Sequence, residues 1–361
     1  MENTITLQPG SATSELLALA IRGLERMYDP QKGLFCHRLR KTSDGLVREG
    51  ISQRYTIMTL LGLLRAQAAG LASPFDVEEA IDLLFEDTSW IDNIGDLGLL
   101  LWLCAATSGQ RLRQFHTMFD VSGSFVRYSD ARRHLTMELS WFLTGLVAAS
   151  KAGHTADLEP LANQTYQLVL RNQGRHGLFG HMARWHSLAG VVRGRVGSFA
   201  DQVYPIFAMA HFSQVFGNGE ARDRALRCAN AICGSQGPLG QWWWHYDSVT
   251  GRVVEHYPVY SVHQHGMAPM ALLALEETSG ADFQKHIQSG LRWITGANEL
   301  HKDMQDQDVG VAWRCIQPPK SISTKIHGLM RKEPLQDSLQ VLYECRPYEL
   351  GWLLYAFADQ K

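Results

Sequence analysis

The chain has 361 residues, of which 45% are hydrophobic and 19% are charged, and its formal net charge is -2. This composition excludes a disordered chain and is typical of a folded protein with a large core. The balanced charge gives no basis for binding nucleic acid or an anionic membrane, because phosphate recognition needs a clustered basic excess. A closed repeat architecture keeps one core at this length, so we expect one domain over residues 1–361.

Two kinds of helical segment alternate along the chain. The first kind is amphipathic, and its members are predicted at residues 14–27, 77–85, 111–119, 158–171, 219–233 and 281–295. The second kind is apolar on all sides after a polar or ionisable opening, and its members open at Ser52, Gly95, Met137, Ala200, Val262 and Arg346. Residues 34–50 are predicted as a loop or a short pair of strands before the first apolar helix.

Helices that are apolar all round belong in an interior, and amphipathic helices belong around them. The alternation therefore predicts an all-α fold, an (α/α)6 toroid of six helical hairpins with long loops and a short β-hairpin at the mouth. In such a ring the polar openings of the inner helices converge on one mouth, which is the expected place for chemistry.

Three long segments separate the later helices, at residues 174–198, 234–261 and 296–344. Loops of this length in a compact domain are usually functional or disordered. The first is rich in glycine, histidine and arginine, and we expect it to be ordered and functional. The second holds the densest aromatic cluster and the predicted β-hairpin. The third is predicted to fold over the ring as a lid or plug.

Carboxylates stand at the openings of four predicted inner helices, as Asp96, Glu138, Asp201 and Glu349. An acid at a helix N-terminus is often only a cap or a partner of the helix dipole. Paired carboxylates are also what acid–base cleavage of a glycosidic bond needs, and crowding them raises one pKa. We therefore take Glu138, Asp201 and Glu349 as catalytic candidates and Asp96 as a substrate-binding candidate.

The aromatic segment from Gly240 to Gly266 supplies flat faces and hydrogen-bonding groups. Stacking platforms for sugar rings and a cage for a carbocation both use aromatic faces. An aromatic hairpin that merely plugs the ring is the structural alternative. The substrate-binding candidates from this segment are Trp243, Trp244, His245, Tyr246, Asp247, Gln264 and His265.

Histidine is frequent in this chain, with 15 residues, so a metal site must be considered. The i, i+2 spacing of His263 and His265 is a weak metal pattern, and no metal or cofactor is expected. Proton transfer by His263 or His265 is the favoured interpretation, because an unperturbed imidazole has a pKa of about 6.5, and His263 is taken as the catalytic candidate. Tyr260 completes the set of catalytic candidates.

Arginines and tyrosines at the inner-helix openings could form an anion-binding mouth. A tyrosine beside an arginine suits proton abstraction next to a carboxylate-bearing carbon. The alternative for each arginine is an ion pair between helices. The remaining substrate-binding candidates are Arg54, Tyr55, Gln202, Tyr204, Arg346 and Tyr348.

Several other classes of function are disfavoured. The glycines from Gly190 to Gly197 lack the preceding strand and the Lys-Ser/Thr of a phosphate loop, and no G-x-S-x-G elbow is present. No stretch reaches the ~18 uninterrupted apolar residues of a membrane span. The first residues lack the features of a secretory signal, so the cytoplasm is the expected location. The scattered cysteines are predicted to be buried free thiols.

The segment PVYSVHQHGMAPMALLAL, residues 258–275, resembles the glucuronyl C5-epimerase pattern of a Tyr-Ser turn before a helix rich in small residues. The six-hairpin pattern as a whole resembles the toroids of six-hairpin glycosidases, polysaccharide lyases and the helical domain of those epimerases. This resemblance implies an enzyme that acts on a glycan or a uronic-acid-containing saccharide.

A second group of toroids, the terpenoid cyclases and protein prenyltransferases, carries a Gln followed by Gly-x-Trp or Gly-Phe at outer-helix ends. QKGLF from Gln31, QGRHGLF from Gln173 and QGPLGQW from Gln236 are similar to that motif. The D-x-D-D acid of class II cyclases is missing, and the nearest string is Asp306-Gln-Asp308 in a loop.

The sequence thus favours a carbohydrate-active hydrolase, lyase or epimerase that binds a small saccharide or oligosaccharide in the central cavity. A terpenoid cyclase or prenyltransferase with an aromatic cavity is one alternative, and a non-catalytic glycan-binding or scaffold protein is the other. Cavity polarity separates the first two, because sugars need many hydrogen-bonding groups and polyenes need a nearly dry barrel.

Overall fold

The computed structural model describes residues 9–130, 134–153, 158–183, 194–319 and 338–360. Its helices are α1 (Pro9–Met27), α2 (Gln53–Ala68), α3 (Val77–Glu86), α4 (Ile94–Thr107), α5 (Gly109–Met118), α6 (Val121–Asp130), α7 (Thr136–Lys151), α8 (Glu159–Leu170), α10 (Ala200–Phe216), α11 (Gly219–Gly234), the π-helical turn η1 (His263–Met267), α12 (Ala268–Ser279), α13 (Gln284–Ile294) and α15 (Pro347–Phe357).

Short strands occupy the connections between these helices. They are β1 (Tyr28–Asp29), β2 (Leu34–Thr42), β3 (Gly45–Ile51), β4 (Val196–Ser198), β5 (His245–Asp247), β6 (Arg252–Glu255), β7 (Val259–Tyr260), β8 (Gln305–Asp306), β9 (Val311–Ala312), β10 (Cys315–Gln317), β11 (Gln340–Leu342) and β12 (Glu344–Cys345).

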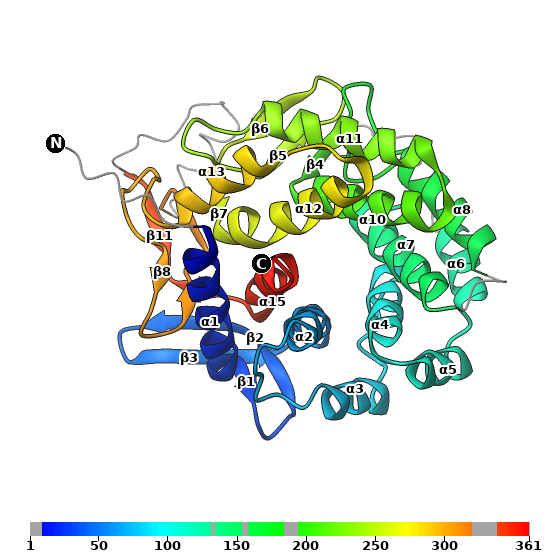
Figure 1. Cartoon of the computed structure of the whole chain (residues 1–361), viewed down its shortest axis with the longest axis horizontal. Coiled ribbons are helices and arrows are strands. Elements are labelled where there is room, and N and C mark those ends of the chain that lie inside the picture. Colours follow the sequence, from blue (N-terminus) through cyan, green and yellow to red (C-terminus); the bar gives the residue numbers. More distant parts are fainter. Residues whose placement is uncertain (1–8, 131–133, 154–157, 184–193, 320–337, 361) are drawn as a thin grey trace.

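Six inner helices close a ring, which confirms the predicted (α/α)6 toroid (Figure 1). In ring order they are α2, α4, α7, α10, α12 with η1, and α15, which packs back against α2. The amphipathic helices lie outside them. The inner helix α4 is buried from Ile94 to Cys104, whereas the outer helix α3 buries Val77, Ala80 and Leu84 and exposes its glutamates. The hydrophobic pattern therefore decided which helices are inside.

The inner helices α4 and α7 approach each other closely at glycines. A Cβ atom on Gly98 would lie 2.3 Å from the Cα of Phe142, and one on Gly145 would lie 2.3 Å from the carbonyl oxygen of Gly98. Near the openings, a Cβ on Gly95 would lie 2.9 Å from the Cα of Glu138. Absence of side chains at these positions brings the first turns of the two helices together.

The two later Gln-Gly motifs have the same structural role. The side-chain amide of Gln173 donates to the carbonyl oxygens of Gly177 and Arg224, and that of Gln236 donates to those of Gly240 and His286. Each glutamine thereby closes the turn after one outer helix and ties it to the next outer helix. The similarity to cyclase motifs thus has an explanation in the assembly of the ring.

The predicted strand pairs are present. β2 and β3 form an antiparallel hairpin before α2, and β5 pairs with β6 at the predicted aromatic hairpin. The third long segment is joined to strands that lead into inner helices, because β12 pairs with β2 and β10 pairs with β7. Its residues 320–337 lie outside the described part of the chain.

Two helical elements were not predicted. The third outer position holds two short helices, α5 and α6, where one was expected, because the glycine and serines of α6 are typical of a loop. The inner helix α12 is entered through the π-helical turn η1, and π-turns leave no simple periodic signal in a sequence.

Buried apolar side chains of the described residues form one contiguous cluster. All six cysteines are free and buried, which confirms the prediction for them. Among the described helices, none combines the length and apolarity that crossing a membrane requires.

Candidate active site

An arginine and an aspartate join the openings of α2 and α4. Arg54 Nε lies 2.5 Å from Asp96 Oδ1, and Arg54 Nη2 lies 2.9 Å from Asp96 Oδ2. The Asp96 carboxylate is fully buried and also accepts from the backbone N–H of Asp92 and the side-chain amide of Asn93. Four donors therefore hold this carboxylate in one orientation.

Glu138, in the first turn of α7, lies beside this ion pair. Burial raises the pKa of the Glu138 carboxyl, and the negative charge of Asp96 raises it further. A hydrogen bond with Tyr128 and the positive charges of Arg54 and His181 act in the opposite direction but do not cancel the increase. The Glu138 side chain is partly exposed. A raised pKa next to a second carboxylate is typical of a carboxyl that acts as a general acid.

A histidine–aspartate pair adds to the same mouth at the opening of α10. His181 Nδ1 lies 3.1 Å from Asp201 Oδ2, which also accepts from the backbone N–H and hydroxyl of Ser198. Asp201 is 1% exposed, and its Oδ1 atom has no hydrogen-bond partner within the described ranges. The His181 side chain is 31% exposed, so its ring is oriented from the buried side and is accessible from the mouth.

These five residues, Arg54, Asp96, Glu138, His181 and Asp201, are called the mouth cluster below. They come from the first turns of α2, α4, α7 and α10 and from the segment that precedes β4. The sequence patterns proposed all of them except His181.

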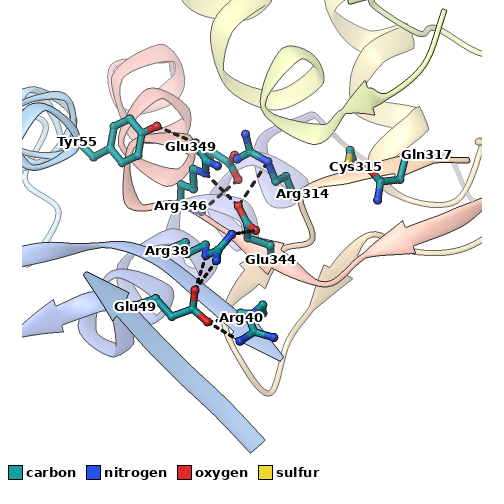
Figure 2. Close-up of polar contacts among 10 residues, drawn as sticks. All are labelled: Arg38, Arg40, Glu49, Tyr55, Arg314, Cys315, Gln317, Glu344, Arg346 and Glu349. Atoms are coloured by element: carbon teal, nitrogen blue, oxygen red, sulfur yellow. Dashed lines mark hydrogen bonds and ion pairs between the residues drawn. The ribbon is translucent and has the colours of Figure 1, made fainter. Parts of the chain in front are cut away.

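A second group, the arginine cluster, surrounds the opening of α15 (Figure 2). The buried carboxylate of Glu349 pairs with Arg314 and accepts from the backbone N–H of Arg346. Glu344 binds Arg346 at 3.0 Å and Arg38 at 3.1 Å. Burial raises the pKa of Glu349, whereas Arg314 and Arg346 outweigh burial and lower the pKa of Glu344. Glu349 is thus committed to an ion pair and a helix cap.

Aromatic rings connect the two groups. Arg346 Nη1 donates to the hydroxyl of Tyr55 at 2.7 Å, and the rings of Tyr55 and Tyr348 are 4.6 Å apart. His37 stacks on Tyr55 at 5.4 Å, and its pKa is lowered by burial and by the charges of Arg346 and Arg38. Because Tyr55 follows Arg54 in the first turn of α2, the arginine cluster continues directly into the mouth cluster.

An aromatic column fills the ring below the mouth. Arg54 lies 5.7 Å above the ring of Trp141, which contacts Tyr204 at 5.2 Å. The Tyr204 hydroxyl accepts from Trp352 Nε1 at 3.0 Å, and burial raises the pKa of that hydroxyl. Trp352 stacks on Trp102 further down. Tyr204 is therefore part of the floor of the mouth.

Much of the predicted aromatic platform is structural. Tyr246 is fully buried, and its hydroxyl accepts from the backbone N–H of Trp243. Trp243 is buried too, and its Nε1 donates to the carbonyl oxygen of Ser235. Trp244 is partly exposed, stacks on His245 at 4.2 Å and meets Tyr260 edge-on. Trp244 is therefore the tryptophan of this run that retains an accessible face.

Polar residues of the hairpin also have local partners. His245 Nδ1 lies 2.5 Å from Glu255 Oε2 on the paired strand. Asp247 accepts from the backbone N–H groups of the following turn and lies 3.4 Å from Arg195. These interactions fix the hairpin and leave little capacity for a ligand.

Neither histidine of η1 has the pKa that was expected of a proton carrier. Burial lowers the pKa of His263 to about 3 and that of His265 to about 3. His263 packs against Phe199 and Tyr260, whose own pKa burial raises to about 12. Neutral, buried imidazoles do not exchange protons near neutral pH, so the unperturbed pKa that motivated this prediction does not apply.

The two glutamine candidates bind backbone groups. Gln202 is fully buried, accepts from the N–H of Phe179 and donates to carbonyl oxygens of Phe179 and Ser198. Gln264 donates to the carbonyl oxygen of Tyr260. Within the described ranges, no group of three or more His, Cys, Asp or Glu side chains is placed to hold a metal ion.

Sequence reasoning missed His181 and Arg314 as members of these clusters. His181 lies in the segment of residues 174–198 that was expected to be functional, but nothing distinguished it from the other histidines there. Arg314 comes from the third long segment and reaches Glu349 only through the pairing of β10 with β7. Its role depends on tertiary structure alone.

The sequence matches no protein-family model and no curated protein. Solved structures do match. Unsaturated glucuronyl hydrolase from Bacillus sp. GL1, described as responsible for the degradation of glycosaminoglycan, is 16% identical with a TM-score of 0.62, over 97% of this chain and 95% of that chain. An unsaturated glucuronyl hydrolase specific for heparin is 14% identical with a TM-score of 0.60, over 96% of each chain.

A possible member of the GH105 family from Salmonella enterica is 12% identical with a TM-score of 0.62, over 99% of this chain and 96% of that chain. At such identities the similarity establishes the fold. The chain has the (α/α)6 toroid fold of these glycosidases over nearly its whole length.

Proposed function

We propose that this chain is a glycoside hydrolase that acts on a uronic-acid-containing saccharide at the mouth of the toroid. The observation that carries the proposal is Glu138, a carboxyl whose pKa is raised beside the ion-paired Asp96. The fold shared with glucuronyl hydrolases supports the same class of reaction.

In this proposal Glu138 is the general acid. It gives its proton to the leaving glycosidic oxygen as the bond from that oxygen to the anomeric carbon breaks. The oxygen of a water molecule forms the new bond to the anomeric carbon. Asp96 is a positioning residue, because its buried carboxylate already accepts four hydrogen bonds and its negative charge keeps the Glu138 proton in place.

His181 is the proposed general base. Its Nδ1 is held by Asp201, which orients the ring and stabilises the imidazolium formed when the other nitrogen takes the proton of the attacking water. Asp201 thereby retains a part in the acid–base work as a positioning residue. Glu349 is no longer a catalytic candidate, because its carboxylate pairs with Arg314 and accepts a hydrogen bond at the start of α15.

The charge of the arginine cluster supports an acidic substrate. Its arginines, Arg38, Arg40, Arg314 and Arg346, outnumber its glutamates, Glu49, Glu344 and Glu349 (Figure 2). Arg346 is 21% exposed and adjoins the mouth through Tyr55, so its guanidinium is placed to meet a sugar carboxylate. Tyr55, Tyr348 and Trp244 are the proposed surfaces for sugar rings.

The polarity of the mouth argues against a terpenoid cyclase. A polyene needs an almost dry aromatic barrel, whereas charged groups of the mouth cluster surround this opening. An acid and a base at one mouth also favour an enzyme over a binding module.

A substrate panel tests the proposal. Purified protein is incubated with uronic-acid oligosaccharides, with neutral oligosaccharides of the same length and with polyprenyl diphosphates, and the products are measured by mass spectrometry. Cleavage with gain of one water, restricted to the uronic-acid substrates, is the expected result. Cleavage without gain of water would instead indicate elimination. Incorporation of one deuterium from D2O without cleavage would indicate epimerisation.

Matched variants locate the reaction. Asp96→Asn and Asp201→Asn should lose activity with the fold intact, whereas Glu79→Gln, an exposed acid on the outer helix α3, should not. Full activity in both aspartate variants would rule out the mouth cluster as the reaction site.

A further inference from the structure

A second cavity lies at the opposite end of the ring from the mouth. It has a volume of about 280 Å³ and is lined by residues of α4, α7, α10 and α15. Lys151 ends α7 and His211 lies in the second half of α10, whereas the mouth cluster lies in the first turns of these helices. The aromatic column from Trp141 to Trp102 separates the two ends.

The lining of this distal cavity combines aromatic rings with small side chains. Trp102 packs against Phe207 at 5.3 Å and against Tyr355 at 5.4 Å, and all three rings line the space. Other lining residues are small, and they include Ala105 and Ala148. A space of this size between aromatic rings and alanines suits a single planar ring, because ligand pockets for larger molecules measure ~300–1,000 Å³.

Two polar groups at the cavity lack partners. Lys151 and His211 line it, and neither side chain makes a hydrogen bond or an ion pair with any residue that the structure describes. Two other lining residues carry hydroxyl groups. Thr144 donates its hydroxyl to the carbonyl oxygen of Ser140, and the Tyr355 hydroxyl is hydrogen-bonded to Arg65. The cavity therefore offers one ammonium group and one imidazole to a ligand.

Two cations act on the imidazole at this cavity. Burial lowers the pKa of His211 to about 4, and the charges of Lys151 and Arg65 lower it further. Arg65 lies over the outer face of Tyr355 and is bound to Asp359, which leaves Lys151 as the cation available to a ligand. An anionic group meets complementary charge at this rim.

We propose that the distal cavity binds a small aromatic carboxylate, with its ring between the aromatic wall and the alanines and its carboxylate on Lys151 and His211. This site is separate from the proposed glycan site and does not depend on it. A neutral imidazole donates one hydrogen bond to the carboxylate, and the ammonium group supplies a charge-assisted one.

Isothermal titration calorimetry with phenylacetate, and with its uncharged amide as a control ligand, tests the proposal. Phenylacetate is expected to bind saturably and about tenfold more tightly than phenylacetamide, because only the acid makes the charge-assisted bond. Absence of saturable binding, or equal affinity for the two ligands, would overturn the proposal.

Variants place the site. Ala148→Phe fills the cavity and should abolish binding of both ligands, whereas Ala68→Phe, at an exposed position at the end of α2, should not. Lys151→Met should remove the preference for the acid without changing amide affinity, and Lys285→Met on α13 should keep it. Unchanged preference in Lys151→Met would refute the role of the lysine even if Ala148→Phe failed to fold.

Independence from the mouth is measured with Asp96→Asn. This variant should bind phenylacetate as the wild type does, because Asp96 lies at the other end of α4. Loss of binding there would show that the ligand occupies the mouth and would refute a distal site.

Discussion

The openings of α7 and α15 both carry a glutamate in the first turn, and the two carboxyls meet different surroundings. Burial raises the pKa of both. Glu349 has Arg314 as its direct ionic partner, whereas the Arg54 guanidinium beside Glu138 binds both oxygens of Asp96. The acid at the opening of α15 thus has its own cation, whereas the cation beside the acid at the opening of α7 is bound to another carboxylate. We propose that this difference leaves Glu138 available for proton transfer.

The sharpest test of this contrast is Glu138→Gln. Loss of a general acid typically lowers the rate by ~10²–10⁴-fold, and we expect a loss in that range with the unfolding temperature maintained. Turnover of the uronic-acid substrate is measured beside thermal unfolding. Glu159→Gln, which changes an exposed first-turn glutamate on α8, is the matched control and should retain activity. Wild-type turnover in Glu138→Gln would show that Glu138 is not the general acid.

Arg314→Met tests the structural role of the ion pair between Arg314 and Glu349. Removal of one partner from a buried ion pair costs about 3–5 kcal/mol of unfolding free energy, because the remaining charges stay buried. Glu349 is 1% exposed and Glu344 is 5% exposed, so both would lose a buried cation. Chemical denaturation measures the loss. Arg40→Met breaks only an exposed pair with Glu49, which solvent screens, so it should cost much less stability than Arg314→Met.

Gly98→Ala tests whether the close contact of α4 and α7 sets up the reactive pair. The added methyl group would lie 2.3 Å from the Phe142 Cα, so the helices must separate, at a cost of about 1–3 kcal/mol. Activity should fall as well, because Asp96 moves relative to Glu138. Gly109→Ala is the control, since its Cβ would meet only Arg113 Nη1 at 3.6 Å. Full activity in Gly98→Ala would show that the close packing of α4 and α7 is not required for activity.

The smallest expected effect is on the pH dependence of stability. Because the pKa of Glu138 is raised in the folded state, the native protein binds more protons at this site than the unfolded chain does. Its contribution to stability must therefore decrease as pH rises from the unfolded pKa through the folded one. Unfolding free energies measured across that interval should fall less steeply in Glu138→Gln than in the wild type. Identical slopes would contradict the raised pKa.

Part of the candidate site follows from the sequence. Asp96, Glu138 and Asp201 were identified because each opens a helix whose apolar pattern places it in the inner ring. Glu349 shows the same pattern, and nothing in the sequence indicates that Arg314, 35 residues earlier, pairs with it. His263 and Tyr246 were proposed from residue type, and burial gives them other roles.

The architecture follows from the amino-acid pattern alone, because two alternating hydrophobic patterns permit few arrangements other than an inner and an outer ring of helices. The end of the ring that carries the ionisable groups also follows from this pattern, since those groups recur at helix openings. Which carboxyls are paired with a cation and which are not depends on the three-dimensional packing. That choice depends on the desolvation and charge of residues far apart in the chain, and local sequence patterns contain no information on either.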